Sequence, residues 1–325
     1  MPIKKAKELD FSEKKIVMLL SGRPGIGKTT LALSSPRPLL IDLEDGVDRV
    51  EACHRKDTMT NEYNGAERYE QFIKDLKEED LSDYDTVIID TLGKLFDMIT
   101  PVVIKENSVN GLKDGRTLSL KGYGAVGQKI SDFIKMIKDK GKNVVIVSHV
   151  TEKNDGEITK IRLQIPGATK DNIWNDIDLG GYIEYVGKDR KIFFTPSERF
   201  DAKGTHGITG SYDVPVLKTT ENGGKEEDNV FLSKLFKIII NNLTKTKNAY
   251  EDEKEKYMVV MNDFLPKVKN CENLETLNEL LVELQNIEHA SSSKKELWQH
   301  IQDKAKELGV IYDKEEKRFV SSIEE

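Results

Sequence analysis

Cysteine, tryptophan and long apolar runs are all scarce in this chain of 325 residues. It contains only two cysteines, Cys53 and Cys271, too few for a disulfide framework, so the sequence favours a reducing compartment. No apolar run approaches the roughly 18 residues that a membrane-spanning helix needs, and no apolar stretch of the kind found in a signal peptide follows the basic N-terminus. We therefore expect a cytoplasmic protein that has no membrane partner.

The charge is acidic overall, with 57 Asp and Glu against 50 Lys and Arg and a formal net charge of -7. Most of the excess lies in residues 221–325, which hold 22 acidic and 16 basic side chains. Bulk charge therefore does not attract this chain to nucleic acid, and any such contact must be made by particular loops. The hydrophobic fraction of 37% is sufficient for a folded core, which excludes collagen-like and wholly disordered proteins.

Short apolar runs alternate with segments of helical spacing in the first half of the chain, which predicts an α/β fold. These runs are Lys15–Ser21, Leu39–Asp42, Thr86–Asp90 and Asn143–Ser148. Strands that are apolar on both faces belong to a mainly parallel sheet covered by helices. After residue 150 the apolar residues alternate with polar ones, including Ile161 and Leu163, then Ile183 and Tyr185, then Ile192 and Phe194. This pattern predicts antiparallel additions to the sheet.

The last third of the chain predicts a separate module, since a length of 325 residues suits two domains. Phe231–Leu243 has the spacing of a helix that closes the core, and the charge-rich segment Thr244–Lys256 predicts a boundary. Two later segments place leucines on one helical face, and the end of the chain suits a hairpin. We expect a core over residues 1–243 and a small, mostly helical C-terminal module over residues 244–325.

Residues 22–29 match the pattern G-x-x-x-x-G-K-[ST] between a predicted strand and a predicted helix. Such a loop turns its backbone N–H groups toward phosphates, so we expect ATP and Mg²⁺ as ligands. Lys28 would reach the β- and γ-phosphate oxygens and act in catalysis, and the Thr29 hydroxyl would bind the Mg²⁺. The predicted nucleotide-binding residues are Gly22, Arg23, Pro24, Gly25, Ile26, Gly27, Lys28, Thr29 and Thr30.

Two carboxylates follow strands near this loop. Asp90 ends the strand Thr86–Asp90, where it would hold the Mg²⁺ together with Thr29, although strands also end in Asp for reasons of turn geometry. Glu44 follows the strand Leu39–Asp42, and a carboxylate there would orient the attacking water. The alternative for Glu44 is a solvated acidic turn.

His149 closes the strand that begins at Asn143. A polar residue at the carboxyl end of a central strand lies in the crevice where α/β sheets bind ligands. We predict that His149 is a catalytic-site residue that senses the γ-phosphate. The alternative is a histidine that merely ends the strand.

These motifs, in this order, make residues 13–243 resemble the RecA/RadA superfamily of P-loop ATPases. The resemblance is to the compact phage members in particular, including the Sak group of single-strand-annealing ATPases. It rests on GRPGIGKT, LLIDLEDGVD, VIIDTLGKL and VIVSHVTEKNDG. It implies a RecA-like core and, if a phage encodes the chain, a site of action in the bacterial host cell.

A second implication of the resemblance concerns assembly. The family forms rings or filaments of identical subunits with ATP between them. Residues 203–207 (KGTHG) are placed like the family motif K-N-R-F-G, so Lys203 would contact the nucleotide of a neighbouring subunit. The Arg of that motif is absent here, and His206 is a candidate substitute.

The family also holds DNA with two loops. The first candidate is Lys105–Gln128, a long, polar, glycine-rich segment that we predict to be a loop. Its DNA-contacting residues would be Lys105, Lys113, Arg116, Lys121 and Tyr123, four cations for phosphates and one ring for stacking. Thr151–Asp171 is a weaker second candidate, and both segments can also be interpreted as ordinary solvated loops.

The resemblance implies an ATPase, stimulated by DNA, that binds single-stranded DNA and anneals or pairs strands in recombination. A ring helicase or motor ATPase is an alternative on the same core. A further alternative is an ATP-gated assembly whose acidic C-terminal module recruits partners, for example a single-strand-binding protein.

Overall fold

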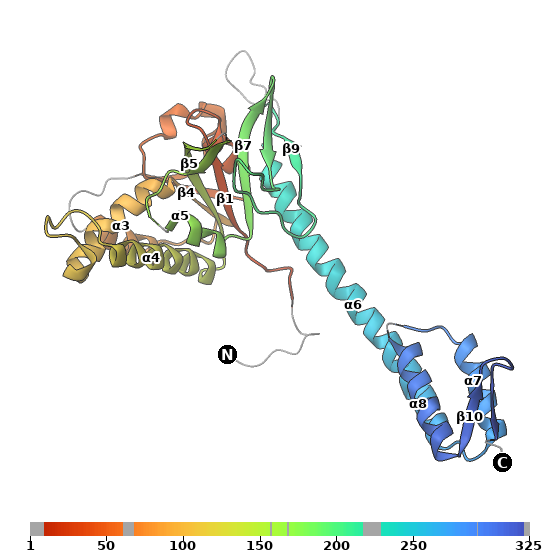
Figure 1. Ribbon diagram of the computed structural model, residues 1–325. Helices are drawn as coiled ribbons and strands as arrows, with labels where there is room; N and C mark the ends of the chain where they lie inside the picture. The colour runs from red at the N-terminus through yellow and green to blue at the C-terminus, as the bar shows by residue number, and fades with distance from the viewer. Residues whose placement is uncertain are drawn as a thin grey trace. The chain divides into compact units, whose positions relative to one another are not determined.

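The computed structural model describes residues 10–60, 68–156, 158–167, 169–216, 229–290 and 292–321. The chain falls into two compact units, of which one is Phe11–Asn242 and the other contains the described residues from Leu243 onward (Figure 1). Within the described residues, no helix is both long and apolar enough to cross a bilayer.

A sheet of nine strands forms the centre of the first unit, counted over the described residues. Its order is β3-β2-β4-β5-β1-β7-β8-β9, with β6 paired to β5. The strands are β1 (Val17–Gly22), β2 (Pro38–Asp42), β3 (Thr58–Thr60), β4 (Thr86–Asp90), β5 (Asn143–Asp155), β6 (Ile158–Leu163), β7 (Leu179–Val186), β8 (Asp189–Phe193) and β9 (Ser211–Asp213). Strands β1 to β5 and β7 pair in parallel, which confirms the predicted α/β fold with a mainly parallel sheet.

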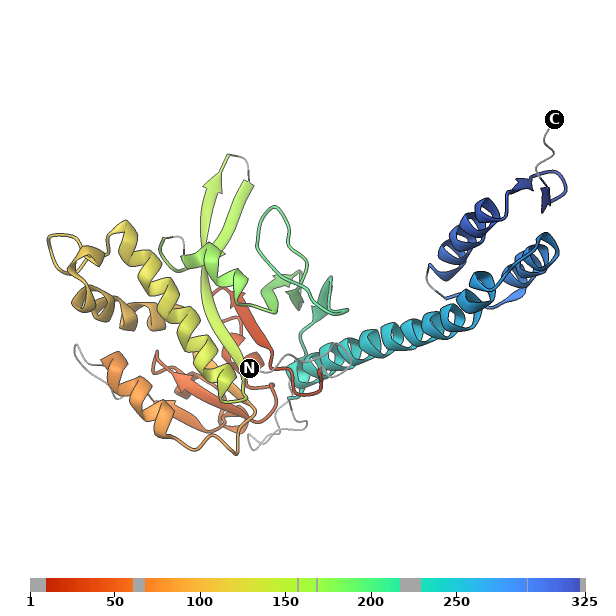
Figure 2. The same ribbon diagram turned by 90° about the horizontal axis from the view of Figure 1, so that it is seen from below.

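The antiparallel additions are β6 on β5, β8 on β7, and β9 on β8. The segment with Ile183 and Tyr185 is β7, which pairs antiparallel with β8, as predicted, and also in parallel with β1. Strand β7 is buried over its first five residues, whereas its last three are partly or fully exposed. Apolar and polar residues therefore alternate at its end, where the strand leaves the core. Strands β5 and β6 form a hairpin that extends past the sheet (Figure 2).

Helices α2 (Arg68–Glu78), α3 (Leu92–Glu106) and α4 (Leu120–Asp139) build one apolar core with the strands. Phe133 of α4 and Phe72 of α2 meet with ring centroids 5.7 Å apart. The short helices α1 (Lys28–Ala32) and α5 (Thr169–Asn172) flank loops. Helix α6 (Phe231–Lys269) begins against the turn that follows α1, since the backbone N–H of Leu232 donates to Ser34 Oγ at 3.0 Å.

The predicted loop Lys105–Gln128 is shorter in the structure. Helix α3 continues to Glu106, and α4 begins at Leu120 with Ser119 as its N-cap, whose Oγ accepts from the backbone N–H of Gly122 at 3.2 Å. The glycines of this segment suggested a loop. Burial of the apolar face of α4 outweighs their weak helix propensity.

The second unit contains most of α6, then α7 (Leu274–Asn286), α8 (Ser293–Glu307) and an antiparallel hairpin of β10 (Val310–Asp313) and β11 (Arg318–Ser321). Its small core includes Phe264, Leu277, Leu297, Ile301 and Phe319. The mostly helical character and the terminal hairpin are as predicted. The two units divide between Asn242 and Leu243, beside the predicted boundary Thr244–Lys256 and inside α6, so the charges of that segment lie on a continuous, solvated helix.

Candidate active site

The parallel pairing of β1, β2, β4 and β5 brings their carboxyl ends to one edge of the sheet. The register pairs Gly22 with His149 and Asp42 with Asp90. Gly22, Asp42, Asp90 and His149, from four segments far apart in the sequence, therefore lie side by side, and β5 continues past His149 to Asp155, beyond the predicted end of that strand. This is the edge at which open α/β sheets bind ligands.

The loop between β1 and α1 has the backbone that its glycines predict. Gly25 and Gly27 have φ angles of 76° and 84°, a region that residues with a side chain rarely adopt. A Cβ at Gly27 would also collide with the guanidinium of Arg190. The loop is therefore curved in the way that exposes backbone N–H groups to an anion.

Lys28 is only 5% exposed, and its ammonium group faces this loop. Nζ donates to the carbonyl oxygen of Arg23 at 2.9 Å and lies 3.1 Å from His149 Nδ1. Burial lowers the pKa of Lys28 to about 8, although the carboxylates of Asp90 and Glu44 oppose the shift. A bound phosphate would supply the negative charge that this buried cation lacks.

Thr29 and Asp90 form the pair expected to hold a divalent cation. Thr29 Oγ1 donates to Asp90 Oδ2 at 2.6 Å. Burial raises the pKa of Asp90 to about 6, partly opposed by the hydrogen bond from Thr29. Hydroxyl and carboxylate oxygens are the ligands that Mg²⁺ prefers, and a nearby cation would favour the charged form that burial disfavours. The two residues fit Mg²⁺.

Glu44 is directed into the site by two groups. Thr91 Oγ1 donates to its Oε1 at 2.7 Å, and His149 Nε2 lies 3.4 Å from its Oε2. Burial alone would raise the pKa of Glu44, but the hydrogen bond from Thr91 and the neighbouring His149 lower it. A cavity of about 290 Å³ adjoins these three side chains. A water in that space would meet an ionised carboxylate.

The turn after β2 is held by Asp42, whose carboxylate is buried. It accepts from the backbone N–H groups of Glu44 at 3.1 Å, Gly46 at 2.8 Å and Val47 at 2.7 Å. The turn is therefore preformed, with Glu44 partly buried while Asp45 and Asp48 are exposed. The sequence indicated Asp42 only as one of several acidic neighbours.

His149 lies between Lys28 and Glu44. Burial and the charge of Lys28 lower the pKa of His149, although Glu44 opposes the shift. The ring is therefore neutral at pH 7. This network assigns Nδ1 as the acceptor from Lys28 and Nε2–H as the donor to Glu44.

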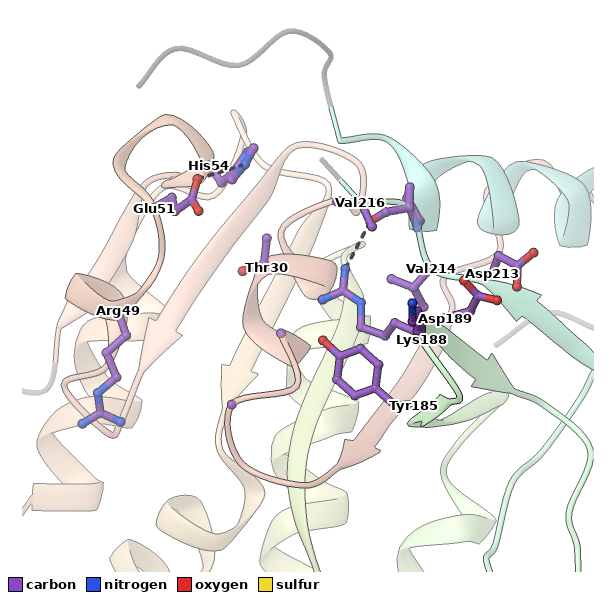
Figure 3. A pocket seen from close by; sticks show the side chains of 14 residues that line it. Thr30, Arg49, Glu51, His54, Tyr185, Lys188, Asp189, Asp213, Val214 and Val216 are labelled. Carbon is purple, nitrogen blue, oxygen red and sulfur yellow. Dashed lines mark hydrogen bonds and ion pairs between the residues drawn. The ribbon is translucent and has the colours of Figure 1, made fainter. Parts of the chain in front are cut away.

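A larger cavity, of about 700 Å³, lies on the other side of the loop, and sequence reasoning missed it (Figure 3). Gly25, Gly27 and Thr30 of the predicted nucleotide set are part of its wall. Arg190 of β8 fastens the loop from that side, with Nη1 donating to the Ile26 carbonyl at 3.1 Å and Nη2 to the Pro215 carbonyl at 3.1 Å. Arg190 belongs to no motif, so only the fold could identify it.

Other predicted nucleotide-binding residues have separate roles in the free protein. Arg23 is exposed and pairs with Glu152 of the β5–β6 hairpin. Pro24 is exposed, whereas Ile26 is buried beneath the loop.

Lys203 lies at the opposite edge of the sheet. Its backbone pairs with Gly180 at the start of β7, and its Nζ donates to the carbonyls of Trp174 at 3.0 Å and Ile177 at 2.6 Å. The carbonyl of His206 accepts from Asn242 at 2.8 Å. Neither residue is near the loop of its own chain.

The predicted DNA-contacting residues lie on and beside the segment between α3 and α4. Lys113 and Arg116 are on the loop, whereas Lys105 is at the end of α3 and Lys121 at the start of α4, and all four are exposed. The expectation for Tyr123 is wrong. Tyr123 belongs to α4 and packs on the core, with its ring stacked on Phe96 at a centroid distance of 6.3 Å, so it offers no free ring on a loop.

Residues 14–206 match the model of a family described as an AAA domain. The chain belongs to this AAA domain family. It contains a P-loop ATPase domain.

Two solved structures resemble the chain in fold. One is an ATPase domain, with 14% identity, a TM-score of 0.37, and coverage of 65% of this chain and 84% of that one. The other is a DnaB-like replicative helicase described with its interactions with primase, with 13% identity, a TM-score of 0.38, and coverage of 65% of this chain and 57% of the helicase. The chain thus spans little more than half of that helicase. A comparison with curated proteins finds no match.

We expect Glu44→Gln to keep ATP binding and to slow turnover by about 10²–10⁴-fold, since the amide cannot take a proton from water. Lys28→Ala, in contrast, should lose nucleotide binding or hydrolysis because the buried cation is gone. ATP affinity and steady-state hydrolysis separate the two. Unchanged turnover of Glu44→Gln would remove Glu44 from catalysis.

Thr91 should act as a positioning residue for Glu44. Thr91→Val removes the donated hydrogen bond at nearly constant shape, which should cost about 1 kcal/mol, or roughly fivefold in kcat, with little change in KM. The acidic limb of the pH–rate profile should also move to higher pH, because that hydrogen bond lowers the pKa of Glu44. Thr91→Ser keeps the hydroxyl, so kcat and the acidic limb of the pH–rate profile should both stay close to those of the wild-type protein. A serine variant as slow as the valine variant would contradict the positioning role of Thr91.

The raised pKa of Asp90 predicts a pH-dependent stability. The charged carboxylate destabilises the nucleotide-free fold at a pH above about 6, and this penalty disappears as the pH falls toward the ordinary value of 3.8. Without Mg²⁺, Asp90→Asn should therefore raise the free energy of unfolding at pH 7.5 by about 1–3 kcal/mol and change it little near pH 4.

Denaturant unfolding at both pH values tests this expectation. Asp85→Asn is the matched control, because the hydrogen bond from Arg37 lowers the pKa of Asp85. The charged Asp85 carboxylate stabilises the fold, so its replacement by an amide should destabilise the protein at pH 7.5. A destabilised Asp90→Asn variant at pH 7.5 would contradict the argument.

Proposed function

We propose that this protein is a DNA-dependent ATPase that binds single-stranded DNA and anneals or pairs complementary strands, as a RecA-like protein of the phage type. The observation that carries the proposal is the course of α3. This helix begins directly after Thr91 in the nucleotide site and ends at Glu106, beside an exposed basic loop. Its 15 residues span about 22 Å, so one continuous helix joins the site of hydrolysis to the proposed DNA contact.

Hydrolysis follows from the side chains of the site. Lys28 neutralises the β- and γ-phosphate oxygens. Glu44 accepts a proton from the attacking water, held in place by the hydrogen bond from Thr91 and by the turn around Asp42. Mg²⁺ held by Thr29 and Asp90 would neutralise charge on the phosphates.

The loop 107–119 suits contact with single-stranded DNA. Asp114 fastens it internally, because its carboxylate accepts from the backbone N–H groups of Arg116 and Thr117 at 2.9 Å each. No carboxylate of the described residues lies within ion-pair distance of Lys113, Arg116 or Lys121, so these cations are available to phosphates. The loop and its end also expose Val109, Leu112 and Leu120, the last at 93%.

The β5–β6 hairpin is the second candidate contact. Its cations are partly neutralised within the chain, since Lys160 pairs with Asp155 and Arg162 lies 3.5 Å from Asp201. The loop 107–119 is therefore the stronger candidate.

Assembly into a ring or filament would complete the nucleotide site. Lys203 and the P-loop lie at opposite edges of the sheet, so Lys203 could meet a nucleotide only in a neighbouring subunit. A ring helicase or motor would use the same site but would separate duplexes with ATP, whereas the proposed activity joins strands. An ATP-gated assembly that recruits a single-strand-binding protein would neither separate nor join them.

Replacing Lys113, Arg116 and Lys121 together by Ala should weaken binding of single-stranded DNA of any sequence. The slope of log K against log salt should fall by roughly 0.7 for each phosphate that the variant no longer neutralises, about 2 in all. The slope is measured from the binding of a labelled oligonucleotide, in the presence of ATP, at a series of salt concentrations. The matched variant Lys153→Ala, Lys160→Ala, Arg162→Ala removes the same charge from the hairpin and should change the slope less. The reverse order would assign the main DNA-binding role to the hairpin.

Mixing Lys203→Ala with Lys28→Ala subunits should restore ATP hydrolysis that neither variant shows alone, because a shared site can combine the intact half of each. The masses of the assemblies in the same mixture show whether the two variants assemble together. Absence of recovered hydrolysis in a demonstrated co-assembly would contradict the action of Lys203 on a neighbouring subunit.

A further inference from the structure

Three side chains of metal-ligand type gather in one turn, away from the Thr29–Asp90 pair, and two of them, Glu51 and His54, line the 700 Å³ cavity. They are Glu51, Cys53 and His54, and one ligand atom of each lies within 4.8 Å of the other two. Within the described ranges, no other three His, Cys, Asp or Glu residues come this close. The three come from one turn, the 3-10 helix Ala52–His54 and the residue before it.

The spacing of these atoms is near that of a tetrahedral metal site. Glu51 Oε2 lies 3.9 Å from His54 Nε2 and 3.9 Å from Cys53 Sγ. Zinc bonds of about 2.0–2.3 Å place tetrahedral ligand atoms about 3.3–3.8 Å apart. Small side-chain movements would bring all three onto one ion.

His54 provides a second observation that favours a ligand at this turn. Its side chain is 6% exposed, and its ring pairs with the Glu51 carboxylate at 3.9 Å. That distance is longer than a hydrogen bond, and an ion bound between the two side chains would contact both. In Figure 3 the ring of His54 and the carboxylate of Glu51 face each other.

The backbone of the turn is already fixed. Arg55 donates from Nε to the carbonyl of Val50 at 3.0 Å and from Nη2 to that of Asp48 at 2.8 Å. The N–H of His54 donates to the carbonyl of Glu51 at 2.8 Å. A metal would therefore meet ligands whose backbone needs no further ordering.

We propose that Glu51, Cys53 and His54 bind a transition-metal ion of the zinc class. A thiolate and an imidazole select such ions over Mg²⁺, so this site is distinct from the Mg²⁺ pair and does not depend on the proposed DNA function. Binding releases the thiol proton of Cys53 to solvent. Glu51 and His54 line the cavity that also reaches Gly25 and Thr30 of the loop after β1.

Titration of the tag-free, full-length protein with Co²⁺ in excess Mg²⁺ tests the proposal. We expect one equivalent to bind with a thiolate-to-cobalt charge-transfer band in the near ultraviolet, and Zn²⁺ to displace it. Cys53→Ser should abolish the band. Glu51→Gln and His54→Gln should each weaken binding by roughly tenfold or more, since even changes behind a metal ligand cost that much.

Cys271→Ser is the matched control, because Cys271 is the other cysteine and is buried in the second unit. It should leave the band unchanged. Circular dichroism of each variant verifies that it is folded. Absence of the band in the wild-type protein, or a band that survives Cys53→Ser and disappears with Cys271→Ser, would overturn the proposal.

Discussion

Lys28 keeps a positive charge in a place that is almost closed to water, and the rest of the nucleotide site is arranged around that charge. The carboxylates of Asp90 and Glu44 stabilise the ammonium, while burial acts against it. Each of these groups comes from a different segment of the chain, and only the parallel register of four strands brings them together. The fold therefore serves to collect charges that would each be costly to bury alone.

The same burial leaves the free site electrostatically unsatisfied. The pKa of Lys28 is lowered and that of Asp90 is raised, so both shifts favour the neutral form of a group that the chemistry requires in its charged form. A phosphate beside the lysine and a divalent cation beside the aspartate would reverse both shifts. Binding of the nucleotide and stabilisation of the fold are thus two results of one electrostatic compensation.

The parts of the site that the sequence predicted are those that depend on local patterns. The P-loop, Asp90, Glu44 and His149 each follow an apolar run, and parallel strands end at one edge, so their meeting could be foreseen. Arg190 could not be foreseen, because it reaches the loop from β8, 164 residues beyond Ile26, and no periodicity encodes such a contact. The prediction of an exposed Tyr123 ring on a loop was wrong. The glycines around Tyr123 suggested a loop, whereas burial of the apolar face of α4 offsets their poor helix propensity.

Strand β5 changes its surroundings at His149. Before this residue it is held on both sides, by β1 and β4, whereas from Val150 to Asp155 it pairs with β6. The segment beyond His149 leaves β1 and β4, but its base still packs on the core, because Ile161 of β6 is buried against Tyr182 and Phe200. Arg23 of the P-loop pairs with Glu152 in that segment, and Lys28 contacts His149 at its base. A phosphate that attracts Lys28 and Arg23 would compete with both contacts, so the β5–β6 hairpin and the nucleotide draw on the same two cations.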